Sequence, residues 1–514
     1  SAVRADSIIS PLFQLDHSKT RKTRNPEMAS AEHGKKLRIM LIPFFATSHI
    51  GPHTDLAVRL AAARPDAVEM TMAVTPANVS VVQAALQRHG ASSASSAVKI
   101  ATYPFPDVDG LPPGVENLTA AGGDAWRVDA AAMDEALTRP AQEALVRELS
   151  PDAVFTDFHF FWNSIIAAEL GVPCVTFSVI GPFSSLALRH LDGGGSDLQE
   201  MVVPGFPGPE IRIPRAELPE FLRCQQKHDR FNPGPGVQGI SRCFGIAFNT
   251  FFDMEQQYCE LYARSADVKR AYFVGPVSLP LPPAGANAGE SPCVSWLGSM
   301  PSCSVVYVCF GTYASISDDQ LRELALGLEA SGKPFLWVLR ADGWVPPAGW
   351  EERVEKRGML VRGWAPQSEI LSLSSIGAFL THCGSSSLLE AAAAGVPMLT
   401  WPLVFDQFIE ERLVTDVLKI GERVWSGARS TRYEDQVTVP AEAVALAVTR
   451  FLEPGGTGEA ARVRAQELAV KAHAAVAEGG SSHSDICRLI NDLIEAKEVV
   501  VGGDTIVAGD IEAN

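Results

Sequence analysis

The sequence lacks the features that define several large classes of protein. Its nine cysteines are odd in number and include no C-x-x-C pair, which argues against a disulfide framework or a zinc site and favours reduced thiols in the cytoplasm. The most apolar segment, 388–405, contains Glu390 and Pro397 and so does not predict a membrane span. No G-x-G-x-x-G turn follows the first predicted strand, which argues against a nicotinamide-dependent oxidoreductase.

Basic residues are also scarce. The chain has 43 Lys and Arg against 60 Asp and Glu, a net charge of −17. Such a chain is a poor partner for nucleic acid or an anionic membrane, so any anionic ligand must be held by local donors. With 46% apolar and 20% charged residues the composition is that of a soluble globular protein. A length of 514 residues predicts two domains of roughly 200–250 residues each.

Strand-like and helix-like segments alternate along most of the chain, which predicts parallel, doubly wound sheets. In the first half the predicted strands are 36–45, 67–75, 97–105, 152–157 and 172–179, and the predicted helices are 52–64, 79–90, 124–149 and 160–170. In the second half the predicted strands are 304–312, 334–340, 358–364, 376–382 and 396–402, and the predicted helices are 317–331, 386–394, 406–418, 440–478 with a break at 454–456, and 481–497. We therefore expect two α/β domains with a ligand between them, at the carboxyl ends of their strands.

Changes in composition predict the domain boundaries. The Gly- and Pro-rich segment 183–240 is expected to form loops that shape a ligand pocket. The expected organisation is a disordered extension (1–35), a first domain (36–278), a linker (279–292), a second domain (293–480), a C-terminal helix (481–498) and a disordered tail (499–514).

The stretch FLTHCGSSSLLEAAAAGVP (379–397) places its polar side chains where a strand meets a helix. The first N–H groups of a helix have no intrahelical partners and, together with the helix dipole, form an anion site. Gly384 would let a phosphate approach the backbone, with hydroxyl donors from Ser385, Ser386 and Ser387 and His382 nearby. The alternative is purely structural, because Ser387 and Glu390 also have the spacing of a capping box.

The sequence on both sides of this stretch indicates one protein family. The order and spacing of nineteen positions between Trp364 and Gln407 resemble the signature box of plant family-1 UDP-glycosyltransferases. The matching positions are W-A-P-Q at 364–367, Leu371, Gly377, Phe379, T-H-C-G at 381–384, Ser387, Glu390, G-V-P at 395–397, Pro402 and D-Q at 406–407. The resemblance covers most of residues 36–498 and implies a GT-B fold, in which two Rossmann-like domains face each other across a cleft. It implies that the first domain binds the acceptor, that the second binds the UDP-sugar, and that the helix 481–498 packs back on the first domain.

The resemblance also implies a role for each residue of the box. Trp364 would stack on uracil, Ala365 and Gln367 would complete the base contacts, and Glu390 would bind the ribose hydroxyls. The diphosphate would meet His382, Gly384, Ser385, Ser386, Ser387 and the nearby Thr312. Asp406 and Gln407 would hold the sugar, with Gln407 favouring glucose. Family members usually read H-C-G-W-N-S, whereas this chain has serine at 385 and 386, which changes the shape of the site near the sugar and the α-phosphate.

The first domain is expected to supply the catalytic base. By resemblance the base is His49 in the segment 43–57, with His53 as its rival, and the partner that orients it is Asp157 in the segment 150–173. The alternative for Asp157 is the N-cap of the helix predicted from 160. His159 would line the acceptor pocket or simply fill space.

The resemblance implies an inverting transfer of a sugar, with glucose favoured, from a UDP-sugar to a small lipophilic acceptor such as a flavonoid, phenolic, terpenoid or hormone. The UDP-sugar is a co-substrate, and no cofactor is expected. The pair Asp107 and Asp109 is the only metal-like motif, and it lies in a loop that has no metal role in the family. We expect a cytoplasmic monomer that binds neither nucleic acid nor membranes. A non-catalytic UDP-sugar-binding protein with a degenerate signature box is the alternative.

Overall fold

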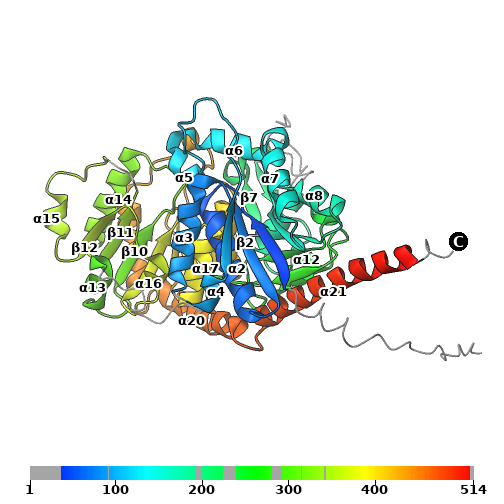
Figure 1. Cartoon of the computed structure of the whole chain (residues 1–514). Coiled ribbons are helices and arrows are strands. Elements are labelled where there is room, and N and C mark those ends of the chain that lie inside the picture. Colours follow the sequence, from blue (N-terminus) through cyan, green and yellow to red (C-terminus); the bar gives the residue numbers. More distant parts are fainter. Residues whose placement is uncertain are drawn as a thin grey trace, which may run out of the picture. The chain divides into compact units, whose positions relative to one another are not determined.

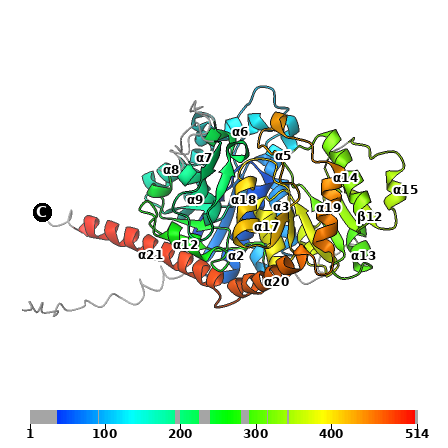
Figure 2. The same ribbon diagram turned by 180° about the vertical axis from the view of Figure 1, so that it is seen from behind.

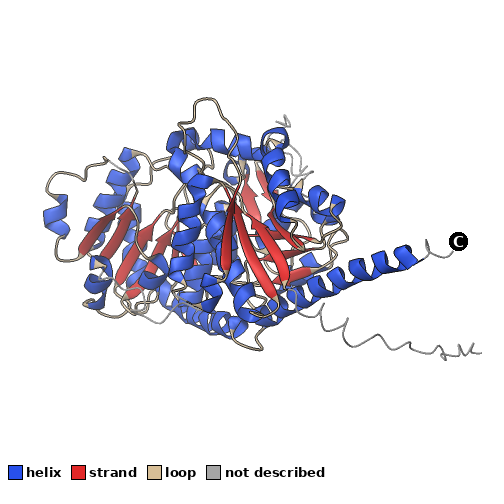
Figure 3. Ribbon diagram, viewed as in Figure 1, coloured by secondary structure: helices blue, strands red, loops and turns tan. Residues whose placement is uncertain are grey.

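The computed structural model of the chain describes residues 36–509 apart from 91, 192–198, 224–238, 280–290, 314 and 341–342. The predicted extension 1–35 and nearly all of the predicted linker therefore lie outside the described residues. Two parallel sheets, each flanked by helices, form the core of the described structure (Figures 1 and 3). Among the described residues, no helix has both the length and the apolar character that crossing a membrane requires.

The first sheet has seven parallel strands in the order β3-β2-β1-β4-β5-β8-β9. With its helices we call it the N-terminal lobe. Its strands are β1 (Leu37–Ile42), β2 (Val68–Val74), β3 (Val98–Thr102), β4 (Ala153–Asp157), β5 (Cys174–Ser178), β8 (Gly245–Phe248) and β9 (Ala271–Phe273). Its helices are α2 (Thr47–Ala63), α3 (Val79–Arg88), α4 (Ser93–Ser96), α5 (Leu118–Ala121), α6 (Ala125–Met133), α7 (Glu135–Leu149), α8 (Asn163–Glu169), α9 (Pro182–Leu191), α10 (Glu220–Arg223) and α12 (Gln256–Ala263).

The second sheet has six parallel strands in the order β12-β11-β10-β13-β14-β15, and its helices complete the C-terminal lobe. Its strands are β10 (Val305–Cys309), β11 (Phe335–Leu339), β12 (Gly358–Arg362), β13 (Ile376–Thr381), β14 (Met398–Thr400) and β15 (Gly421–Arg423). Its helices are α13 (Pro292–Gly298), α14 (Asp318–Ser331), α15 (Trp350–Val354), α16 (Gln367–Leu371), α17 (Ser385–Ala394), α18 (Gln407–Arg412), α19 (Ala441–Leu452) and α20 (Thr457–Val476). Both sheets confirm the predicted doubly wound α/β class.

Several predicted elements begin or end elsewhere. Helix α2 starts at Thr47 rather than 52, so His49 lies in its first turn and not in a loop. The predicted helix 124–149 is broken at Asp134, whose carboxylate accepts the N–H groups of Ala136 and Leu137 and so caps a new helix. The predicted loop segment 183–240 contains α9, α10 and a two-stranded hairpin of β6 (Glu200–Val202) and β7 (Arg212–Pro214) in its described parts.

Each sheet reverses its strand order once, and ligands of open parallel sheets bind outside the carboxyl ends of the strands at such points. In the N-terminal lobe the reversal lies between β1 and β4, whose ends pair at Ile42 and Thr156. In the C-terminal lobe it lies between β10 and β13, whose ends pair at Cys309 and Thr381. Asp157 is the last residue of β4 and His49 follows β1, while Thr312 follows β10 and His382 follows β13.

The last helix, α21 (Ser481–Gly509), packs against α2 and β9 of the N-terminal lobe. Both views show its first turns beside α2 (Figures 1 and 2). Asp492 accepts the hydroxyl of Tyr272 at 2.6 Å, and the hydroxyl of Ser482 donates to the carbonyl of Gly275. The helix extends beyond residue 498, where the sequence analysis placed the start of a tail, and residues 510–514 lie outside the described structure.

Buried charges join the two lobes on another side. Glu217, in the N-terminal lobe, binds the guanidinium groups of Arg412 and Arg429 from the C-terminal lobe. Glu411 is fully buried and binds the same two arginines together with Arg423. Close by, the N–H of Thr431 donates to the carbonyl of Ala216, and its hydroxyl donates to the carbonyl of Leu218. Removing one partner of such a cluster leaves an uncompensated charge in the interior.

We expect Glu217→Ala to lower the free energy of unfolding by about 3–5 kcal/mol, because two buried guanidinium groups lose their carboxylate. Urea denaturation would measure the change. Glu200→Ala is the matched control, because the pair of Glu200 with Arg212 is about half exposed and solvent screening leaves it little effect on stability. Equal effects of the two substitutions would contradict a structural role for the buried cluster.

Candidate active site

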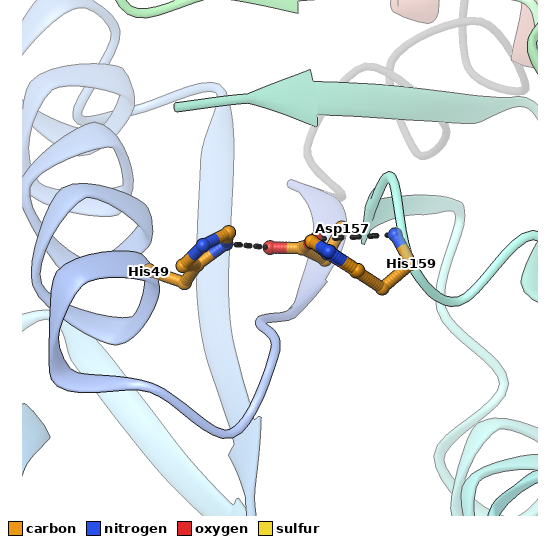
Figure 4. A group of neighbouring side chains, drawn as sticks. All are labelled: His49, Asp157 and His159. Carbon is orange, nitrogen blue, oxygen red and sulfur yellow. Dashed lines mark hydrogen bonds and ion pairs between the residues drawn. The ribbon is translucent and has the colours of Figure 1, made fainter. Parts of the chain in front are cut away.

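The Asp157 carboxylate lies at the carboxyl end of β4 and is buried beneath two histidines (Figure 4). Its Oδ2 is 2.8 Å from Nδ1 of His49 and accepts the N–H of Phe44 at 3.3 Å. Its Oδ1 is 2.7 Å from Nδ1 of His159 and accepts the N–H of the same residue at 3.2 Å. Burial raises the pKa of Asp157, but the two imidazoles outweigh burial and hold it well below its ordinary value.

This arrangement removes the structural alternative for Asp157. Helix α8 begins at Asn163 with Trp162 at its N-cap position, so the Asp157 side chain does not cap that helix. The carboxylate instead binds donors from three elements: β4's own following turn, the loop after β1, and the first turn of α2. The predicted pairing of His49 with Asp157 is present.

His53, the rival base, lies one turn further along α2 and is fully buried. Its Nδ1 donates to the carbonyl of His49 at 2.8 Å, and its Nε2 is 3.9 Å from Oδ2 of Asp157. Burial lowers the pKa of His53 to about 4, a value that the nearby Asp157 only partly offsets. At neutral pH this ring is therefore neutral, and it supports the backbone on which His49 is mounted.

In the C-terminal lobe, α17 begins at Ser385 with Gly384 as its N-cap residue and no side-chain cap. Ser387 is thus inside the helix, and the capping-box alternative is wrong. Cys383 has φ of 65°, a left-handed conformation rare outside glycine, and this turn carries the chain from β13 into the helix. The first amide groups of α17 therefore have the geometry of an anion site.

His382 is held between two glycines at this turn. A Cβ atom at Gly311 or Gly384 would come within 2.4 or 2.6 Å of its Nε2. Burial lowers the pKa of His382 to about 4, and the carbonyl of Cys309 opposes this effect only in part. The imidazole beside the start of α17 is therefore neutral at physiological pH, and Thr312 follows Gly311 on the neighbouring strand end.

The predicted nucleoside residues gather between β12 and α17. The indole of Trp364 is 67% exposed and free to stack, while Ala365 beside it is buried. The Gln367 amide nitrogen donates to Glu390 at 2.8 Å and to Ser387 at 3.0 Å. Gln367 thus positions Glu390, and burial raises the pKa of that carboxyl.

Tyr307 of β10 adds a contact that the sequence analysis did not foresee. Its hydroxyl donates to Oε1 of Gln367 at 3.2 Å, so the orientation of that amide is fixed from both ends. No signal in the sequence pointed to Tyr307, since it reads as one more apolar residue of a buried strand.

Asp406 and Gln407 lie at the start of α18. Oε1 of Gln407 accepts the N–H groups of Leu403 and Val404, which fixes the orientation of the amide and leaves its NH₂ group as a donor. Burial raises the pKa of Asp406, and the attraction of His49 and His159 opposes this rise. The predicted sugar-binding residue is therefore within electrostatic range of both imidazoles of the other lobe.

Glu410, also on α18, was missed by the sequence analysis because adjacent glutamates on a helix resemble a solvated face. It is buried, and its Oε1 accepts the hydroxyl of Ser385 at 2.8 Å. The Ser385 side chain thus binds a carboxyl group of its own lobe. Burial raises the pKa of Glu410 to about 8, and the charge of Asp406 contributes to the increase.

Among the described residues, one group of three could offer ligand atoms to a metal ion, namely His49, Asp157 and His159, whose atoms lie within 4.8 Å of one another. Both Nδ1 atoms and both carboxylate oxygens already face each other in hydrogen bonds, which a cation would have to replace. Asp107 and Asp109, for which no metal role was expected, do not belong to this group.

The raised pKa of Glu410 has a consequence for stability. An unfolded Glu loses its proton near pH 4.5 and the folded residue near pH 8, so the folded state holds more protons between these values and stability falls as the pH rises through that window. We expect Glu410→Gln to melt at nearly the wild-type temperature at low pH and several degrees above it at pH 9. Glu355→Gln, at an exposed site, should follow the wild type throughout. A constant difference between Glu410→Gln and wild type from pH 5 to pH 9 would contradict this assignment.

The chain is similar in sequence to known proteins along most of its length. A family model described as "UDP-glucoronosyl and UDP-glucosyl transferase" matches residues 286–421. Scopoletin glucosyltransferase of Nicotiana tabacum is 34% identical over 478 residues, which cover 89% of this chain and 98% of the relative. UDP-glycosyltransferase 73C5 of Arabidopsis thaliana is 34% identical over 493 residues, with 90% and 97% covered.

Solved structures of plant glycosyltransferases have the same fold as this chain. UGT73P12 of Glycyrrhiza uralensis, complexed with glycyrrhetinic acid 3-O-monoglucuronide, has a TM-score of 0.82 and 30% identity, covering 93% of this chain and 100% of that one. UGT2 of Phytolacca americana, complexed with UDP-2fluoro-glucose and pterostilbene, has a TM-score of 0.73 and 26% identity, covering 89% and 99%. With its two doubly wound lobes and its signature-box residues gathered around α17, the chain belongs to the plant family-1 UDP-glycosyltransferases and is a glycosyltransferase of the GT-B fold.

Proposed function

We propose that this enzyme transfers glucose from UDP-glucose to a hydroxyl group of a small lipophilic metabolite, with inversion and without a metal ion. The observation that carries the proposal is the pairing of His49 with the buried Asp157 at 2.8 Å. The pairing places the imidazole proton on Nδ1 and leaves Nε2 as the basic nitrogen, the arrangement that a general base requires. The His49 side chain is 18% exposed, whereas the rival His53 is fully buried.

In the proposed reaction, Nε2 of His49 takes the proton of the acceptor hydroxyl while the acceptor oxygen attacks the anomeric carbon. The bond from that carbon to the diphosphate breaks, and UDP leaves with the electron pair. Asp157 stabilises the imidazolium that forms. The first amides of α17 and His382 stabilise the charge that develops on the diphosphate, so that local donors replace a cation.

The donor residues support glucose. The Gln407 amide has its carbonyl oxygen fixed by two backbone N–H groups, so it presents N–H donors toward sugar hydroxyls. Asp406 supplies acceptors within electrostatic range of His49. The structure of the relative from Phytolacca americana is a complex with UDP-2fluoro-glucose, and the tobacco relative is named for glucosyl transfer.

Aromatic residues around the His49–Asp157 pair support an apolar acceptor such as a phenolic, flavonoid or terpenoid. Phe44 packs against His49 with ring centroids 5.2 Å apart, and against Phe160 at 6.0 Å. Phe158, beside the dyad, is 36% exposed. The expected contribution of the 183–240 loops falls partly on residues 192–198 and 224–238, which lie outside the described structure.

The test is incubation with UDP-glucose, UDP-galactose and UDP-xylose against a panel of phenolic acceptors, with and without EDTA, followed by mass spectrometry. We expect a glucoside in the presence of EDTA, with a β linkage by NMR. His49→Ala should lose transfer by at least about a thousandfold and still bind UDP, since the base contributes to chemistry and not to donor affinity. UDP binding without transfer by the wild type would favour the alternative of a non-catalytic binding protein, and transfer that needs a divalent ion would refute the mechanism.

A second test concerns the donor site alone. Gly384→Ala would place a methyl group 2.6 Å from Nε2 of His382 and so displace the ring from the start of α17. We expect UDP affinity, measured by calorimetry, to fall about tenfold, which corresponds to about 1.4 kcal/mol. Gly298→Ala is the matched control, because a Cβ there meets nothing within 4 Å. Unchanged UDP affinity in Gly384→Ala would argue against this end of α17 as the diphosphate site.

A further inference from the structure

Asp157 holds a second imidazole as tightly as it holds the first (Figure 4). Nδ1 of His159 is 2.7 Å from Oδ1, and Nδ1 of His49 is 2.8 Å from Oδ2. Each ring must carry a hydrogen on Nδ1 to form its hydrogen bond with the carboxylate, so each presents Nε2 on its far side. The two centroids are 5.3 Å apart in an edge-to-face arrangement.

His159 is more than a space-filling residue. Its ring stacks on Phe44 at 4.2 Å with an interplanar angle of 27°, a contact that any aromatic side chain would make. The hydrogen bond to Asp157 is specific to a donor, and the side chain keeps 27% of its surface exposed, compared with 18% for His49. Both imidazoles thus reach the same partly open site from opposite sides of one carboxylate.

We propose that His159 is a positioning residue of the catalytic centre, which fixes Asp157 and governs the protonation of His49 through the carboxylate that they share. The inference rests on the proposed transfer reaction. One carboxylate stabilises one imidazolium far better than two, so the protons on the two Nε2 atoms compete. When His159 carries the positive charge, His49 is kept as the free base that accepts the proton of the acceptor.

The surrounding charges favour this division of roles. Burial lowers the pKa of His159, but Asp157, Asp129 and Asp406 together outweigh burial and raise it. Asp129 and Asp406 also face His49, and the other nearby ring, His53, is neutral. His159 therefore keeps its positive charge to a higher pH than an ordinary imidazole, and that charge lies 5.3 Å, centroid to centroid, from the ring of His49, where it opposes a second proton.

Two substitutions separate the hydrogen bond of His159 from its charge. His159→Asn keeps an N–H donor near the position of Nδ1 but removes the charge, and His159→Phe removes both. His473→Asn is the control, because that histidine is exposed on α20. The measurement is the pH dependence of kcat/KM with UDP-glucose and an acceptor that the wild type glucosylates.

Without the neighbouring cation, His49 gains its proton at a higher pH, so the acid limb of kcat/KM should move up by about one pH unit in both variants. We expect kcat at the optimum to fall about tenfold in His159→Phe and to recover to within about threefold of wild type in His159→Asn, because the amide restores the support of Asp157. His473→Asn should match the wild type. An acid limb that stays within about 0.2 pH units of wild type in His159→Asn would overturn the proposal.

A direct titration makes the result independent of activity. In protein labelled with ¹⁵N-histidine, the His49 signals are identified by their loss in His49→Ala, and we expect their midpoint to rise by about one pH unit in His159→Asn. An unchanged midpoint would overturn the role of His159 even if the wild type proved inactive. Absence of transfer by the wild type would refute the proposed function alone, so the two failures are distinguishable.

Discussion

The need to neutralise one buried carboxylate determines how the N-terminal lobe is built around its active site. Asp157 ends a central strand, where the sheet leaves almost none of its side chain exposed to water. A buried charge of this kind persists only if donors surround it, and here the two oxygens receive four N–H groups. The loop after β1, the first turn of α2 and the turn after β4 are therefore all arranged around Asp157. The carboxylate that these donors hold in place in turn orients the imidazole of His49.

In the proposed reaction the C-terminal lobe meets a different constraint, since it has to bind a diphosphate without a basic surface. The start of α17 offers uncapped amides for this role in place of lysine or arginine, in agreement with the acidic composition. The carboxyl groups near this site, Glu390, Asp406 and Glu410, all have raised pKa values because they are buried. Their raised pKa values reduce the negative charge that would otherwise repel a diphosphate.

Much of this arrangement could be predicted from the sequence, because it depends on patterns that are local. Alternating apolar strands and helices predicted both sheets, and the order of the signature box predicted which residues would meet around α17. Strand ends at a reversal of strand order bring His49 and Asp157 together, although they are far apart in the sequence. The reversal of strand order therefore explains why the two residues that the resemblance paired are in contact.

The predictions that were wrong or missing concern helix starts and side chains whose contacts are not visible in the local sequence. Helix α2 was expected to start near Pro52, yet proline is tolerated inside it and the first turn forms five residues earlier. Ser387 fitted a capping box, but the turn at Cys383 starts the helix two residues before it. Glu410 carries no local signal, because its partner Ser385 is 25 residues away and only the fold brings the two together. His159 was left between two roles, because the sequence does not show that its ring binds the nearby Asp157.

The placement of His382 between Gly311 and Gly384 also couples the substitutions that these three positions can accept. A side chain at either glycine would have to move the imidazole out of the space beside it. Gly311 is constrained twice, since its φ of 73° already disfavours other residues. A larger residue at either glycine therefore keeps this packing only together with a smaller residue at 382, so the three positions have to be redesigned as one unit.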